Sequence, residues 1–182
     1  MSDRAVVPYL LALCALFAAA FLGGMVAPPS VRQQVTEALL VVGEQYRDLA
    51  GGTLFFYILV HNVMASLLLL ASGLLYGIVP VLAVGSNGFV LGVLYSQEAL
   101  AVGYSKAAMK VVPHGIFEIP ALLFTASYGV WLGIRSIRRV RGKEEPPLRV
   151  PVNHAFERYF VVVFPLLVMA AAIETFLILR PQ

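Results

Sequence analysis

Five long apolar runs dominate the sequence and limit the folds that it can adopt. A helix needs about 20 apolar residues to cross a bilayer, and each run reaches that length. The runs cover residues 5–26, 54–78, 81–102, 111–134 and 159–179. The bilayer core offers no hydrogen-bond partners to an open backbone, so such runs cross it as helices. The sequence predicts an all-α, polytopic helical membrane protein with about five transmembrane helices.

Composition agrees with this class. The 182 residues are 60% hydrophobic and 13% charged, whereas a soluble domain is about half apolar and a quarter charged. This length leaves no room for a second, soluble domain, so we expect one integral-membrane domain over residues 1–182. The lone cysteine, Cys14, lies in the first run and has no disulfide partner within the chain. That run is longer than a signal-peptide core and is predicted to be a retained helix.

The segments between the runs differ in character. Residues 30–49 alternate polar and apolar side chains at helical spacing, which predicts an amphipathic helix at the outward membrane interface. Residues 103–110 are predicted to form a short linker, and residues 135–158 a polar, basic loop. A very tight turn at Pro80 predicts that the two helices it joins are antiparallel neighbours. His154 and Glu157, in the basic loop, are expected to be solvated.

The basic residues predict the orientation. Seven Lys and Arg residues lie in the loop 135–158, and cytoplasmic loops carry such an excess. This loop is therefore predicted to be cytoplasmic in a multi-pass protein of the cell membrane. Counting back through alternating spans places the N-terminus in the cytoplasm and the C-terminus outside. Because the net charge of +3 is concentrated in one loop, it is a topology signal and does not indicate nucleic-acid binding.

Polar side chains inside the runs share one depth. The positions are His61, Asn62, Asn87, His114, Glu118 and Glu174. At 1.5 Å per residue from the outward helix ends, His61 and Glu118 lie ~10 Å deep and Glu174 ~8 Å deep. His114 and Glu118 are four residues apart, which stacks them on one helix face. We expect these residues to form one polar cluster in the outer half of the membrane.

Each member also has a purely structural interpretation. His61 alone is more often a hydrogen-bonded core histidine than a ligand, and Asn62 and Asn87 are commonly interhelical hydrogen-bond partners. The acids are harder to explain in this way, because a charged residue at the bilayer centre costs at least ~2.5–3.5 kcal/mol. A structural Glu–His pair that holds two helices together explains Glu118 as well as a functional site does.

Three kinds of chemistry fit such a cluster. His61, His114, Glu118 and Glu174 offer the nitrogen and oxygen ligands of zinc or another divalent metal. A proton relay or ion path is the second interpretation, since acids and histidines in a water-accessible channel can titrate near neutral pH. Hydrolysis is the third, but the sequence contains neither His-Glu-x-x-His nor Gly-x-Ser-x-Gly. We therefore assign no catalytic residue, and the sequence favours a non-enzymatic protein.

The run Pro113-His-Gly-Ile-Phe-Glu-Ile-Pro-Ala121 resembles the hallmark of the stage II sporulation protein M family. Asn62, Asn87-Gly88 and Ile173-Glu174 match further family positions, so the resemblance covers about residues 54–179. The chain departs from the family after Glu174, where Phe-Leu follows Thr175 in place of the expected Thr-Pro. Five residues of the predicted cluster occupy motif positions of the family: Asn62, Asn87, His114, Glu118 and Glu174. His61 belongs to the predicted cluster only because of its location.

The resemblance implies a membrane scaffold. In spore-forming bacteria the family member works with two cell-wall hydrolases during engulfment, and homologues also occur in bacteria and archaea that make no spores. We therefore expect a non-enzymatic scaffold or complex subunit whose His/Glu/Asn cluster can bind a divalent metal. An ion or small-molecule transporter or channel is the alternative, and a metal-dependent membrane hydrolase comes third. Expected partners are the lipid bilayer, further copies of the chain, and membrane or cell-envelope proteins. Gly73 and Gly77 are expected to allow close helix packing within or between subunits.

Overall fold

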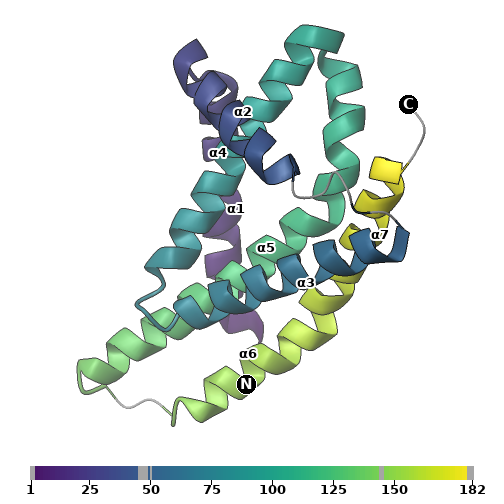
Figure 1. Ribbon diagram of the computed structural model, residues 1–182. Coiled ribbons are helices and arrows are strands. Elements are labelled where there is room, and N and C mark those ends of the chain that lie inside the picture. Colours follow the sequence, from purple (N-terminus) through teal and green to yellow (C-terminus); the bar gives the residue numbers. More distant parts are fainter. Residues whose placement is uncertain (1–2, 45–48, 50, 144–145, 180–182) are drawn as a thin grey trace.

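The computed structural model describes residues 3–44, 49, 51–143 and 146–179 (Figure 1). Within helices, it leaves the side chains of residues 41–44, 110–111 and 113–114 undescribed. The described residues form helices and no strand, which confirms the all-α prediction. The elements are a 3-10 helix (Asp3–Ala5), α1 (Val7–Met25), α2 (Pro29–Glu44), α3 (Gly51–Ser72), α4 (Ile78–Val102), α5 (Tyr104–Val140), α6 (Arg149–Arg158), a π-helix (Tyr159–Val163) and α7 (Phe164–Leu179).

Five helical stretches are long and apolar enough to cross a membrane, as predicted. They are Val7–Met25, Gly51–Ser72, Ile78–Val102, Gly115–Val140 and Arg149–Leu179. The fourth is the most buried and forms the centre of the bundle. Around it, α5 contacts α1, α3, α4 and α7 (Figure 1).

Glycines bring α1 and α4 into close contact. Gly24 on α1 faces the backbone of Phe89, and Gly88 and Gly92 on α4 face the backbones of Phe17 and Phe21. In a membrane, small residues of this kind let helix backbones approach and gain van der Waals contact. The most extensive helix pairing in the bundle is therefore α1 with α4.

The turn between α3 and α4 packs against α5. Tyr76 and Gly77 both have left-handed backbones, with φ of 62° and 74°, a conformation that glycine adopts without strain. Gly73 and Gly77 lie against Gly129, Val130 and Gly133 of α5. The two helices that we predicted to be antiparallel neighbours instead diverge from this turn (Figure 1), with α3 packed mainly on α7 and α4 mainly on α1. Gly73 and Gly77 thus serve packing within the subunit.

The linker predicted at residues 103–110 is wrong, because α5 begins at Tyr104 and continues to Val140. Gly103 alone separates α4 from α5, with φ of 90° and ψ of 154°. Lys106 and Lys110 suggested a break, but charged residues beyond the apolar layer are compatible with a helix. Figure 1 shows a bend along α5. This helix contains Pro113 and Pro120, and proline both removes a backbone donor and clashes with the preceding turn.

The basic loop predicted at residues 135–158 is also shorter than expected. α5 extends to Val140 and helix resumes at Arg149. From there α6, the π-helix and α7 follow one another without a break. The π-helix precedes Pro165, a residue that cannot donate a backbone hydrogen bond. At this turn the Tyr159 hydroxyl is buried against Ser66 of α3, with the two oxygens 2.7 Å apart.

The amphipathic segment predicted at residues 30–49 is α2 over its described part, and residues 45–48 lie outside the described residues. It is tied to α4 through Gln97. Thr36 Oγ1 lies 2.9 Å from Gln97 Oε1 and donates to it, and Gln97 Nε2 donates to the carbonyl oxygen of Arg32 at 3.2 Å. Its placement at the membrane interface stays a prediction.

An acidic residue near the N-terminus is bound to the start of the last span. Tyr128 donates its hydroxyl to Asp3 Oδ1 at 2.9 Å, and His154 Nε2 lies 3.0 Å from the same oxygen. Arg158 Nη2 lies 3.0 Å from Asp3 Oδ2. His154 is therefore buried, against our expectation that it is solvated, and its ring contacts those of Tyr128 and Trp131. The N-terminus and the basic segment lie at one end of the bundle, whereas its orientation in the cell stays a prediction.

Asp3 should make the stability of the protein pH-dependent. Partial burial raises the pKa of Asp3, but the Tyr128 hydrogen bond and the positive charges of Arg158 and His154 outweigh it, so the net pKa lies below the ordinary 3.8. A lowered native pKa stabilises the fold above the unfolded-state pKa, and this contribution is lost as the pH falls through the native value. Asp3→Asn should cost about 1 kcal/mol at pH 7, the scale of an exposed ion pair.

The measurement is thermal unfolding of the purified protein in detergent between neutral and strongly acidic pH. The matched control is Glu157→Gln, since Glu157 is exposed one residue before Arg158. The gap between wild type and Asp3→Asn should begin to narrow at the unfolded-state pKa of Asp3 and close once the pH is below its lower native pKa. An unchanged gap at the acidic end would contradict this role of the carboxylate.

Candidate functional site

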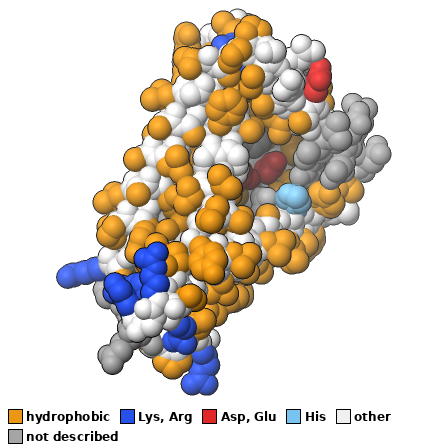
Figure 2. All heavy atoms as spheres, turned by 90° about the vertical axis from the view of Figure 1, so that its left-hand side faces the viewer, with side chains coloured by type: hydrophobic (Ala, Val, Ile, Leu, Met, Phe, Trp, Pro, Cys, Tyr) orange, Lys and Arg blue, Asp and Glu red, His pale blue; other side chains and the backbone are white. Residues whose placement is uncertain are grey.

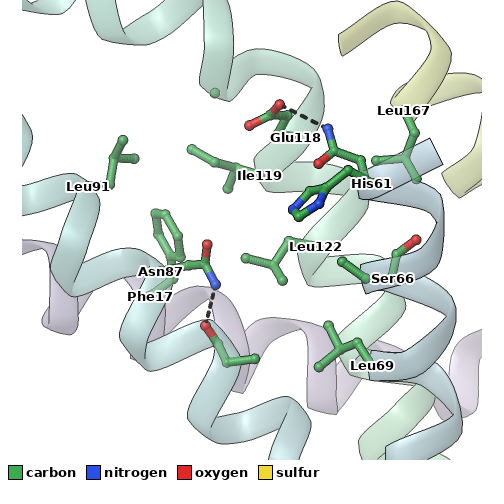
Figure 3. Close-up of a pocket in the computed structure, with 14 residues that line it drawn as sticks. Phe17, His61, Ser66, Leu69, Asn87, Leu91, Glu118, Ile119, Leu122 and Leu167 are labelled. Atoms are coloured by element: carbon green, nitrogen blue, oxygen red, sulfur yellow. Dashed lines mark hydrogen bonds between the residues drawn. The ribbon is translucent and has the colours of Figure 1, made fainter. Parts of the chain in front are cut away.

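Five helices line a cavity of about 370 Å³, and most of the predicted polar positions lie in its wall. Asn62 and His61 come from α3, Asn87 from α4 and Glu118 from α5 (Figure 3). Leu167 of α7 and Phe17 of α1 contribute apolar wall. Figure 2 shows a hollow in this face with acidic and histidine side chains in it and hydrophobic side chains around it.

Glu118 is the central polar group of the cavity. Its side chain is half-buried, and Asn62 Nδ2 donates a hydrogen bond to its Oε1 at 3.4 Å (Figure 3). Glu174 of α7 is also half-buried, and its carboxyl group lies close enough to that of Glu118 for the two to interact electrostatically. The structure thus brings Asn62, Glu118 and Glu174 together from three helices.

His61 and Asn87 lie nearer to the opening, and both are exposed. The ring of His61 stacks on Tyr57, with centroids 6.5 Å apart and planes 9° from parallel. Asn87 Nδ2 donates to the carbonyl oxygen of Ala83 in its own helix at 2.8 Å. This bond uses one of the two N–H donors of the Asn87 side chain, which leaves the second donor and the side-chain oxygen for a ligand.

His114 lies on α5 one turn before Glu118, but its side chain is outside the described residues. The structure therefore places the side chains of three of the four predicted metal ligands, His61, Glu118 and Glu174, but not that of His114. Among the side chains that the structure describes, no group of three or more His, Cys, Asp or Glu is arranged to hold a metal ion.

Sequence reasoning missed the less polar part of the wall. Ser66 lines the cavity floor, where its hydroxyl meets that of Tyr159. Leu122 and Leu91 also line the wall. Helical spacing carries the signal for all three, because each lies four residues after a polar position, namely Asn62, Glu118 and Asn87. Phe17 could not be found in this way, since no polar residue marks that face of α1.

The arrangement favours binding over catalysis. Two carboxyl groups in contact repel each other when both are ionised, and a bound cation relieves that repulsion. The amide groups of Asn62 and Asn87 add neutral hydrogen-bonding capacity beside them. Ser66, the hydroxyl nearest to the acids in the cavity wall, is already bonded to Val63 and Tyr159.

A bundle of membrane-length helices around an internal acidic cavity defines a small polytopic membrane protein with a buried polar site. The chain belongs to the family described as stage II sporulation protein M, which it matches over residues 8–177. It is also similar to an uncharacterised protein of Methanocaldococcus jannaschii, at 31% identity over 121 residues that cover 66% of this chain and 68% of the relative. No solved structure matches the chain. The resemblance seen around His114 and Glu118 is confirmed.

Proposed function

We propose that this protein is a non-enzymatic subunit or scaffold of a membrane complex, and that its cavity binds a small cationic group. The observation that supports the proposal is the proximity of the carboxyl groups of Glu118 and Glu174 beside an open cavity. Intramembrane acids usually face a cavity or a partner and mark ligand or ion sites. Membership of the stage II sporulation protein M family supports the scaffold role.

A divalent metal such as zinc is one cation that this site could take. Glu118 and Glu174 would supply carboxylate oxygens, and His114, one turn before Glu118 on α5, would supply a nitrogen ligand. Membrane or cell-envelope proteins and further copies of the chain are the partners that we propose for the complex.

Transport is the second candidate. The cavity opens on the surface of the bundle (Figure 2), so a bound ion has a route to one side. The acids and His61 are drawn from different helices, and a movement of one helix would change the site.

Metal binding gives a direct test. The purified protein should hold zinc or bind added Zn²⁺ or Mn²⁺, and Glu118→Gln should weaken that binding by at least about tenfold, the scale on which metal sites respond to loss of a coordinating partner. Glutamine keeps the size of the side chain and can still bond to Asn62. The measurements are elemental analysis and metal titration in detergent.

The matched control is Glu157→Gln, an exposed acid outside the cavity. Equal metal binding by both variants would contradict the site. A flux assay in vesicles separates the two candidates: ion flux lost in Glu118→Gln supports transport, whereas unchanged flux with lost partner recovery supports the scaffold.

A further inference from the structure

The acidic cavity adjoins a second, apolar groove. This groove has a volume of about 630 Å³ and lies between α1, α4 and α5. Four residues line both spaces: Phe17, Leu91, Gly115 and Ile119. Beyond this shared wall the groove continues along Ala18 and Leu22 of α1 and Ile116 of α5.

The two spaces have opposite chemistry. The cavity wall carries Glu118, His61 and two asparagines, whereas the groove is lined by hydrophobic side chains and a glycine. A molecule that fills both must be amphiphilic, with a polar end at the acids and an apolar chain along α1. The acids favour a head group that is positively charged, because an anionic head would be repelled by Glu118 and Glu174.

We propose that the cavity and the groove together bind one lipid-like molecule, with an ammonium head group at Glu118 and a hydrocarbon chain in the groove. The inference rests on the proposed function, since it takes the acidic pair as a cation site and names the chemistry of its ligand. It also explains why the polar cavity opens among hydrophobic side chains (Figure 2): a lipid can enter sideways from the bilayer.

Three probes separate the head from the chain. Dodecylammonium has both parts, butylammonium has the head with a short chain, and dodecanoate has the long chain with the opposite charge. We expect dodecylammonium to bind the detergent-purified protein at least about tenfold more tightly than either of the others, because each buried methylene adds to the affinity. Competition against a bound fluorescent alkylammonium measures all three.

Two neighbouring alanines on α1 provide a matched pair of variants. Ala18 lines the groove, whereas Ala19, also exposed on α1, is absent from both linings. Ala18→Trp should fill the groove and lower the affinity for dodecylammonium at least about tenfold, with butylammonium unaffected. Ala19→Trp should change neither. Glu118→Gln should weaken both ammonium probes.

The outcomes distinguish this inference from the function on which it rests. If both ammonium probes depend on Glu118 but the long chain adds no affinity, the cation site stands and the lipid proposal is overturned. Equal binding of dodecanoate and dodecylammonium, or equal effects of the two tryptophan variants, would also overturn it. If Glu118→Gln changes the affinity neither for the ammonium probes nor for a metal ion, both the lipid proposal and the proposed cation site are overturned.

Discussion

Replacing Gly92 with alanine is expected to lower the thermal stability of the purified protein strongly. A Cβ at this position would lie 2.0 Å from the carbonyl oxygen of Phe21 and 3.1 Å from the amide nitrogen of Met25, both on α1. These are backbone atoms, so no side-chain rotation relieves the clash and α1 must move away from α4. Overpacking of this kind costs about 1–3 kcal/mol, and more where backbones are in contact.

Gly85 provides the control for this experiment on the same helix. A Cβ at Gly85 meets nothing within 4 Å, and alanine favours a helix by roughly 0.5–1 kcal/mol over glycine. Gly85→Ala should therefore melt at the same temperature as the wild type or higher. Parallel melting curves in one detergent give the comparison, and equal stability of the two variants would argue against the close contact of α1 with α4.

Gly133→Ala is expected to have an effect of similar size at a different contact. The added Cβ would lie 2.3 Å from the amide nitrogen of Gly77 and 2.6 Å from the carbonyl oxygen of Gly73. The turn between α3 and α4 would have to lift away from α5, with a cost of about 1–3 kcal/mol by the same overpacking argument.

Gly115→Ala is the matched control on α5. Its Cβ would meet only the side chain of Ile119, at 2.8 Å from Cδ1 and 3.6 Å from Cγ1. That side chain can change rotamer, so a small effect on the melting temperature is expected. A large loss of stability in Gly115→Ala together with none in Gly133→Ala would contradict the proposed packing of the turn.

Much of the fold could be predicted because the bilayer imposes a simple rule on the sequence. Long apolar runs must be helices, and all five were found, although the last span begins at Arg149, ten residues before its predicted start. One error lies within a run: the turn predicted at Pro80 is formed by residues 73–77, and Pro80 lies in α4. The other errors lie in the segments between the runs. Lys106 and Arg149 were taken to mark loops, yet both lie in helices, because charge excludes a segment from the apolar layer without preventing helix formation.

The candidate site could be predicted only in its polar half. His61, Glu118 and Glu174 are conspicuous in apolar helices, and their similar depth predicted that they meet. Phe17 lines the same cavity, but no polar residue marks its face of α1, so the sequence gives no signal of its partners. The contact of Asp3 with His154 spans nearly the whole chain, and local patterns do not reveal such pairings.

The π-helix at Tyr159–Val163 has a consequence for the acidic pair. A π-turn holds about one residue more than an α-turn, and each residue of an α-helix corresponds to about 100° of rotation. All of α7 is therefore turned about its axis relative to an uninterrupted continuation of α6. The π-helix therefore sets the direction in which the Glu174 side chain points, although it lies several turns before Glu174, at the level where Tyr159 meets Ser66. Rewinding that one turn would rotate Glu174 away from Glu118 while every helix stays in place.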